Sequence, residues 1–172
     1  EEEVRFLYAG RLSAVKNVGP MIEAVKSYDR TCSFTILGDG EERGKMEKLA
    51  DGDKRIRFIG AVKPDEVQRA MKEADVLIMN STFEGIPMTI LEAISQGLPV
   101  ITTDVGGIKE VLTYGKDSEV TDGSVERIHT AMDKILLDYE AYAKAAYDKS
   151  LQFDYRKVNR KVFDVLNESL HW

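Results

Sequence analysis

Cysteine and histidine are scarce in this chain, and their scarcity excludes several kinds of site. The single cysteine, Cys32, cannot form a disulfide within the chain, which suits a protein of a reducing, cytoplasmic compartment. His129 lies in an expected helix and His171 near the last residue, and neither has the spacing to further ligands that a metal site requires. No serine or cysteine is patterned with histidine for nucleophilic catalysis. The sequence therefore predicts no metal ion and no cofactor.

Excess positive charge and long apolar runs are also lacking. Lysine and arginine number 24 against 30 aspartates and glutamates, and the net charge of -6 argues against a nucleic-acid backbone as partner. No apolar run is long enough to cross a membrane. The first residue is glutamate and not methionine, so the sequence leaves open that the chain is a fragment of a longer protein. The absence of a signal peptide therefore says little about such a parent protein. A length of 172 residues with 43% hydrophobic residues suits one soluble domain, residues 1–172.

Strand-like and helix-like segments alternate along most of the chain. The alternation predicts a parallel, Rossmann-like α/β sheet of five to six strands with helices on both faces and a helical C-terminus. Expected strands cover 4–9, 33–37, 56–59, 76–79 and 99–102, and expected helices cover 19–27, 41–50, 65–72, 87–96, 108–112, 125–137, 139–151 and 155–170. Between 114 and 123 only Val120 suits a buried strand, so a sixth strand is expected to be very short or missing.

The turn at 80–85 carries the strongest functional signal. It joins a buried strand to a helix expected to begin at Pro87, and a helix start binds anions through its unpaired N–H groups and its dipole. Because proline has no N–H, the donors are expected at Ile86, Met88 and Thr89. Glu84 lies at the lip of this site, and Glu92 can lean back toward it, since helical side chains tilt toward the N-terminus. Two such carboxylates suit sugar hydroxyls, although either one alone could be an ordinary solvated glutamate.

Two cations follow the first expected strand. Arg11 and Lys16 flank its carboxyl end, which is where parallel α/β sheets bind ligands. Arginine offers a planar fork for phosphate oxygens, and lysine offers a mobile point charge. Alone, both could serve loop solubility. With the helix start and the two glutamates, they predict a site for a nucleotide diphosphate sugar.

Several motifs in order resemble a known family. They are Gly10-Arg11-Leu12, Lys16-Asn17, Ile36-Leu37-Gly38-Asp39-Gly40, Phe58-Ile59-Gly60, Glu84-Gly85, Glu92-Ala93 and Thr103-Asp104-Val105-Gly106-Gly107. Together they resemble the C-terminal, donor-binding domain of retaining glycosyltransferases of family 4, which have the GT-B fold. The resemblance covers nearly the whole chain and weakens after about residue 114, where the family has a longer segment.

The resemblance implies a role for each matching residue. Arg11 and Lys16 would hold the donor diphosphate, and Glu84 would bind hydroxyls of the transferred sugar. These three are the expected catalytic residues. Glu92 would bind the ribose. The backbone at Ala61 and Val62 would border the base, and Gly38 and Gly40 would let the chain turn close to the nucleotide. Ser81 and the N–H groups of Ile86, Met88 and Thr89 would line the phosphate pocket. Gly10 is the remaining donor-binding position.

The resemblance also implies a partner. The acceptor site would lie on an N-terminal domain that this chain lacks, so the chain alone is expected to bind a donor such as a UDP-sugar without transferring sugar. Polysaccharide biosynthesis is the expected setting, with the base, the sugar and the acceptor open. A free-standing nucleotide-sugar-binding or scaffold module without turnover is the alternative, and a related epimerase fits the motifs less well. The helix expected at 155–170 has a basic face, and we expect this face to be solvated. Contact of this face with an anionic membrane surface is the weaker alternative.

Overall fold

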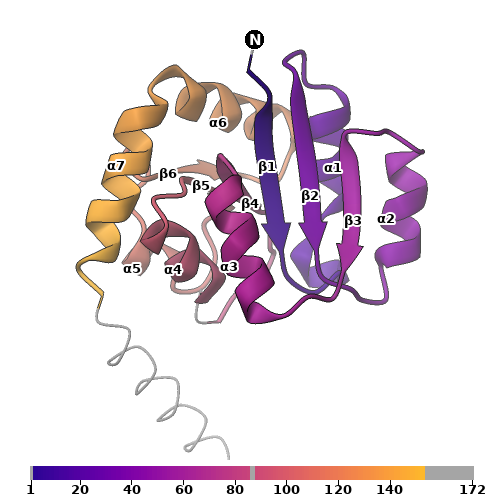
Figure 1. Ribbon diagram of the computed structural model, residues 1–172, viewed down its shortest axis with the longest axis horizontal. Helices are drawn as coiled ribbons and strands as arrows, with labels where there is room; N and C mark the ends of the chain where they lie inside the picture. The colour runs from indigo at the N-terminus through magenta and orange to yellow at the C-terminus, as the bar shows by residue number, and fades with distance from the viewer. Residues whose placement is uncertain (1, 86–87, 154–172) are drawn as a thin grey trace, which may run out of the picture.

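The computed structural model describes residues 2–85 and 88–153, and this part of the chain forms one parallel sheet between helices (Figure 1). Its strands follow the order β3-β2-β1-β4-β5-β6, and every neighbouring pair is parallel. The strands are β1 Val4–Ala9, β2 Cys32–Leu37, β3 Ile56–Gly60, β4 Val76–Met79, β5 Val100–Thr103 and β6 Ser118–Thr121. The predicted parallel α/β architecture is therefore confirmed.

Helices connect the strands and cover both faces of the sheet. They are the short 3-10 helix η1 Ala14–Lys16, then α1 Gly19–Lys26, α2 Arg43–Ala50, α3 Pro64–Glu73, α4 Met88–Ser95, α5 Ile108–Val111, α6 Val125–Leu137 and α7 Tyr139–Ser150. Helix α6 packs against α1 and β6, and α7 packs against α4. Helix α2 begins two residues later than predicted, because Glu41 and Glu42 belong to the preceding turn. Pro87 and the helix predicted at 155–170 lie outside the described residues.

The strand order reverses direction at one point in the sheet. The chain runs outward from β1 to β2 and β3, and then returns through α3 to place β4 on the other side of β1. The carboxyl edge of the sheet at β1 and β4 is therefore the point of strand-order reversal, which is the usual ligand site of such sheets.

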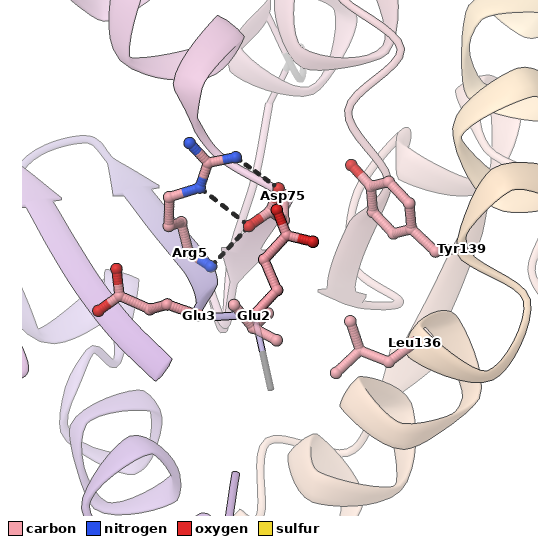
Figure 2. A pocket seen from close by; sticks show the side chains of 7 residues that line it. Glu2, Glu3, Arg5, Asp75, Leu136 and Tyr139 are labelled. Carbon is pink, nitrogen blue, oxygen red and sulfur yellow. Dashed lines mark hydrogen bonds and ion pairs between the residues drawn. The ribbon is translucent and has the colours of Figure 1, made fainter. Parts of the chain in front are cut away.

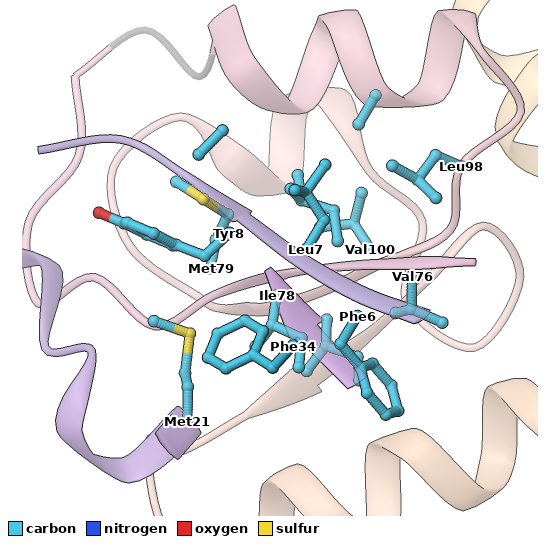
Figure 3. Close-up of a cluster of buried hydrophobic side chains, with 14 of the residues drawn as sticks. Phe6, Leu7, Tyr8, Met21, Phe34, Val76, Ile78, Met79, Leu98 and Val100 are labelled. Carbon is cyan, nitrogen blue, oxygen red and sulfur yellow. The ribbon is translucent and has the colours of Figure 1, made fainter. Parts of the chain in front are cut away.

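The core forms because the inner strands are buried on both sides. All four residues of β4 and the last four of β1 are buried, and Figure 3 shows Phe6, Phe34 and Ile78 among the side chains packed between the layers. The inner side of α4 is also buried through Ile90, Leu91 and Ile94, and Leu98 in the loop after it is buried as well. This rigid centre fixes where each strand ends, and therefore where the loops of the site begin.

The sixth strand forms from residues that the sequence analysis did not expect to be buried. Ser118, Glu119 and Thr121 are buried, whereas Val120 is partly exposed, so the prediction for Val120 was wrong. Glu119 can be buried because the Tyr142 hydroxyl donates to its Oε1 over 2.5 Å and Lys134 Nζ lies 3.2 Å from its Oε2. A buried carboxylate with a hydroxyl and an ammonium partner avoids most of its desolvation cost.

Replacing Tyr142 by phenylalanine should lower the free energy of unfolding by about 1–3 kcal/mol, because Glu119 then keeps its burial but loses its hydroxyl donor. Urea unfolding followed by circular dichroism measures the change. Tyr147→Phe on the same helix is the control, since Tyr147 is 49% exposed and its hydroxyl makes no hydrogen bond within the described chain. Equal stability of the two variants would contradict the role given to Tyr142.

The turn after β5 packs closely against the turn after β4. Gly106 has a φ of +56°, and a Cβ atom added there would lie 2.1 Å from the carbonyl oxygen of Glu84. Beside it, Thr103 Oγ1 donates a hydrogen bond to the carbonyl of Ser81 over 2.6 Å. The backbone that carries Glu84 therefore rests on a position where only glycine fits.

Gly106→Ala should lower the free energy of unfolding by on the order of 1–3 kcal/mol, because alanine disfavours the left-handed backbone and its methyl group would displace the Glu84 turn. Gly107→Ala is the matched control. Gly107 has a φ of -86°, and the nearest atoms to an added Cβ lie 3.9 Å away. The packing argument fails if both variants unfold at the same urea concentration.

Candidate functional site

Two hollows adjoin over the carboxyl end of β1. The first, here the α3-side hollow, has a volume of about 360 Å³ and the second, the α4-side hollow, about 200 Å³. Both are lined by Ala9, Gly10, Arg11 and Thr89. The α3-side hollow adds Leu37, Gly38, Asp39, Ala61, Val62, Pro64, Val67 and Glu92, and the α4-side hollow adds Lys16, Met79, Glu84, Met88 and Ile90. Most of the residues predicted from the sequence therefore lie around one region.

The α4-side hollow contains an ion pair between two of the predicted residues. Lys16 Nζ, at the end of η1, lies 2.7 Å from Glu84 Oε1, and their side chains are 24% and 11% exposed. Ser81 donates its hydroxyl to the same oxygen over 2.6 Å. The second oxygen, Oε2, accepts no hydrogen bond within the described residues. Ser81 was predicted to line a phosphate pocket, but here its hydroxyl is used to orient Glu84.

A buried asparagine holds the loop that carries Lys16. Asn80 directly follows β4 and is fully buried, and its Nδ2 donates to the carbonyl oxygens of Asn17, at 3.2 Å, and Gly123, at 3.3 Å. Its Oδ1 has no partner within the described residues. The backbone N–H of Thr82 donates to the carbonyl of Val15 over 2.8 Å. These bonds fix the loop after β1 against the turn after β4, so Lys16 and Glu84 are kept within reach of each other.

Arg11 lies at the junction of the two hollows and pairs with an acidic residue from the neighbouring turn. Its Nη2 is 2.7 Å from Glu41 Oε2, and both side chains are largely exposed. Glu41's own backbone N–H, and then Arg11, lower the pKa of the Glu41 carboxyl below its usual value. Glu41 is therefore ionised at neutral pH. An exposed pair of this kind is weak, so a phosphate can replace Glu41 at low cost.

The side chain of Tyr8, in β1, fixes the backbone of the loop that carries Arg11. Its hydroxyl donates to the carbonyl of Arg11 over 2.7 Å, and it lies close to Gly10, where an added Cβ would come within 2.8 Å of it. Burial, and then the negative charge of Glu84, raise the pKa of Tyr8 above its usual value. The hydroxyl therefore stays protonated and keeps donating at neutral pH.

Two predicted glycines serve a packing role. Gly38 has a φ of +128°, and a Cβ added to it would lie 1.8 Å from the carbonyl oxygen of Gly10. A Cβ on Gly40 would lie 2.3 Å from the carbonyl oxygen of Leu12. Both glycines therefore let their turn pack against the loop after β1, and their expected role in letting the chain turn close to the nucleotide stays a prediction.

Glu92 lines the α3-side hollow together with Ala61 and Val62, whose backbone is predicted to border the base. It is partly exposed and lies one turn along α4 from Met88 and Thr89, whose N–H groups belong to the first turn of the helix. Gln68 Nε2 donates to Glu92 Oε2 over 3.0 Å. Ile86, the remaining predicted donor, lies outside the described residues.

A larger hollow of about 440 Å³ lies at the opposite, amino edge of the sheet (Figure 2). It is lined by Glu2, Glu3, Val4, Arg5, Asp75, Leu136 and Tyr139. Its arginine, Arg5, is held by Asp75, which accepts from Arg5 Nε at 3.1 Å, from Nη2 at 3.0 Å and from its backbone N–H at 2.8 Å. Two further carboxylates beside this pair would repel an anionic ligand, so its size alone does not make it the functional site.

The cleft over β1 brings two cations and the start of a helix together with two carboxylates. Arg11, Lys16 and the start of α4 supply positive charge and donors. Glu84 and Glu92 each have one oxygen engaged and one without a partner in the described chain. Such a site suits a ligand that is anionic in the middle and carries hydroxyls at both sides. Within the described residues no group of three or more histidine, cysteine, aspartate or glutamate side chains could hold a metal ion, and no helix is long and apolar enough to span a membrane.

Three positioning residues escaped the sequence analysis. Asn80 was assigned only to a turn, Gln68 was not considered, and Gly106 appeared only as part of a motif. A buried polar residue at a strand end is a usable signal for Asn80. The role of Gln68 depends on how α3 packs beside α4, which no local pattern reports.

Comparison with known proteins identifies the family and the fold. The sequence model of the family described as "Glycosyl transferases group 1" matches residues 1–150. The sulfoquinovosyl transferase of Arabidopsis thaliana is 27% identical over 168 residues, covering 94% of this chain and 32% of that protein. The chain spans between 30% and 48% of the length of eight curated relatives that it matches.

Solved structures share the fold. The Anabaena protein HepE, determined in complex with UDP and glucose, superposes with a TM-score of 0.82 at 20% identity, over 96% of this chain and 48% of that chain. The C-terminal domain of the glycosyl transferase group 1 family protein LpcC from Francisella tularensis superposes with a TM-score of 0.75 at 23% identity, over 87% of this chain and 85% of that domain. The chain therefore belongs to the glycosyl transferases of group 1 and has the fold of the C-terminal, GT-B-type domain of that family.

Proposed function

We propose that this chain is the donor-binding domain of a retaining glycosyltransferase of family 4, and that it binds a nucleotide diphosphate sugar whose glycosyl group passes to an acceptor. The observation that carries the proposal is the convergence of two cations and two half-engaged carboxylates over the carboxyl end of β1. The separate components are common in proteins. Around one cleft, they place hydrogen-bond donors for an anion between two carboxylates that can accept hydrogen bonds from hydroxyls. This arrangement matches the distribution of charge and hydroxyls in a nucleotide diphosphate sugar.

The proposed pose assigns each part of the donor to a part of the cleft. The diphosphate lies between Arg11, Lys16 and the start of α4. The ribose lies in the α3-side hollow against Glu92, with the base along the backbone of Ala61 and Val62. The transferred sugar then extends toward Glu84. UDP is the first nucleotide to test, because it is bound in the HepE structures.

Binding requires the cations to exchange partners. Arg11 would leave Glu41 for a phosphate, and this exchange costs little because the pair is exposed to solvent. Lys16 needs a smaller change, because an ammonium has three hydrogens and can bind a phosphate oxygen while it still donates to Glu84. The pocket thus gains a dianion without leaving Glu84 uncompensated.

The chemical step follows from the same charges. The bond between the anomeric carbon and the phosphate oxygen breaks, and its electron pair stays on the phosphate. Arg11, Lys16 and the N–H groups at the start of α4 stabilise the added negative charge, so the proposal needs no metal ion. Positive charge develops on the sugar ring, and Glu84 orients the ring through a hydroxyl contact. The retention of configuration rests on the family resemblance.

Arg11→Ala and Lys16→Ala should each weaken UDP binding by on the order of 1.5–3 kcal/mol without unfolding the chain, because each removes a charge-assisted contact to phosphate. Isothermal titration calorimetry in buffer containing EDTA measures the change and also tests metal independence.

Glu41→Gln supplies a check of opposite sign. Loss of the carboxylate that competes for Arg11 should make UDP binding modestly tighter, which is the opposite of the effect expected for the two alanine variants. Wild-type affinity in both alanine variants would remove the phosphate assignment. UDP binding that requires a divalent ion would contradict the proposed metal independence.

The chain alone should bind donor but not transfer sugar at an enzyme's rate, because one domain cannot orient both substrates or exclude water from the cleft. The proposed acceptor-binding partner is an N-terminal domain, in the cytoplasmic setting expected from the sequence. A transfer assay with UDP-sugars and candidate acceptors tests this expectation. Turnover near the low end of ordinary enzymes, roughly 1 s⁻¹, would show that no second domain is needed.

A further inference from the structure

Glu92 is held by a side chain that does not line the cleft. Gln68 on α3 donates from Nε2 to Glu92 Oε2 over 3.0 Å. Gln96, in the turn directly after α4, donates from its Nε2 to Gln68 Oε1 over 3.0 Å. The three side chains therefore form a directed series of hydrogen bonds that runs from this turn to α3 and then to the carboxylate on α4.

The chemistry of the groups fixes the direction of this series. A carboxylate only accepts hydrogen bonds, so the NH₂ group of Gln68 must face Glu92. With Gln68 reversed, its carbonyl oxygen would lie about 3 Å from a carboxylate oxygen, which is repulsive. The Gln68 carbonyl then faces outward, and Gln96 satisfies it. The outer amide thus stabilises the inner one in the orientation that Glu92 needs.

The two carboxylates of the cleft differ in the charge of their partners. Glu84 is paired with the ammonium of Lys16. Glu92 is held by an uncharged amide, so this partner brings no opposing charge to the carboxylate. Its other oxygen, Oε1, accepts no hydrogen bond within the described residues. Pro64 and Val67 on α3 line the α3-side hollow, whereas Gln68 on the same helix does not.

We propose that Gln68 is a positioning residue for nucleotide recognition: it holds one oxygen of Glu92 so that the other faces the two ribose hydroxyls of the donor. The proposal deepens the proposed function and rests on it. A lysine at this position would hold the carboxylate too, but it would neutralise the charge that attracts the hydroxyls. An apolar residue would leave the carboxylate free to rotate toward water.

The experiment compares UDP with 2′,3′-dideoxy-UDP, which lacks the two hydroxyls. Gln68→Leu should weaken UDP binding about three- to tenfold, the usual effect of one hydrogen bond, and should change the dideoxy compound by less than about twofold. Glu92→Gln should show the same ligand dependence. In the Glu92→Gln background, Gln68→Leu should cause no further ligand-dependent loss, because both residues act on the same contact.

Two further variants keep the test sharp. Gln68→Glu removes the donor and adds a like charge opposite Glu92, so it should lose at least as much UDP affinity as Gln68→Leu. Arg69→Ala is the control on the neighbouring residue, whose guanidinium lies 3.7 Å from Asp65 in an exposed pair, and it should bind both ligands normally. Urea unfolding confirms that each variant is folded.

Equal losses for UDP and the dideoxy compound, or no loss in either folded Gln68 variant, would overturn the positioning role. A different result addresses the proposed function. If the unaltered chain binds none of UDP, ADP and GDP, the donor site itself is wrong, and the inference about Gln68 falls with it. A parent that binds UDP and 2′,3′-dideoxy-UDP equally would place the ribose hydroxyls away from Glu92 while leaving the diphosphate site intact.

Discussion

The ion pair between Lys16 and Glu84 joins the two loops on which the whole cleft depends. One loop follows β1 and the other follows β4, and the two strands are neighbours because the sheet reverses its order between them. Neither side chain is well exposed, so each charge would be costly to leave without the other. The pair therefore holds the mouth of the site together before any ligand arrives. Asn80, buried beneath it, adds two uncharged hydrogen bonds to the same junction.

The two glutamates of the cleft, Glu84 and Glu92, lie in different electrostatic environments, and each environment suits the role proposed for that residue. A glutamate beside a lysine contributes little net charge, and it can face a sugar ring without repelling a nearby phosphate. A glutamate beside a glutamine keeps its charge, and it can attract hydroxyls further from the phosphate. Glu84 and Glu92 have these two environments at the two ends of one cleft. The difference arises from their neighbours on η1 and α3, and not from the residues themselves.

Much of the fold could be predicted because short-range patterns determine it. β-branched runs that alternate with helical periodicity gave the strands β1 and β4 and the helix α6 with their observed bounds, and the carboxyl edge of a parallel sheet then located Arg11 and Lys16. Strand β6 was harder, because its buried Glu119 depends on Tyr142 and Lys134, which lie 23 and 15 residues away in helices. A polar strand can be buried only when distant side chains form hydrogen bonds with its polar groups, and the local sequence pattern does not show which distant side chains will do so.

The candidate site, like the fold, could be predicted only in those features that depend on local sequence. Residue types and strand ends indicated which side chains gather, but not which atoms they bond. Glu41 was predicted to begin a helix over 41–50, yet it lies in a turn and pairs with Arg11 across 30 residues. Gln68 holds Glu92 across 24 residues. These contacts depend on the placement of whole helices against the sheet, so they could be seen only in three dimensions.

The most direct test of this account is a crystal structure of the chain with UDP bound. The account predicts diphosphate oxygens within about 3 Å of Lys16 Nζ and the Arg11 guanidinium, with the ribose hydroxyls on the open oxygen of Glu92. A nucleotide bound away from the carboxyl end of β1, with Arg11 still on Glu41 and Lys16 contacting only Glu84, would contradict it.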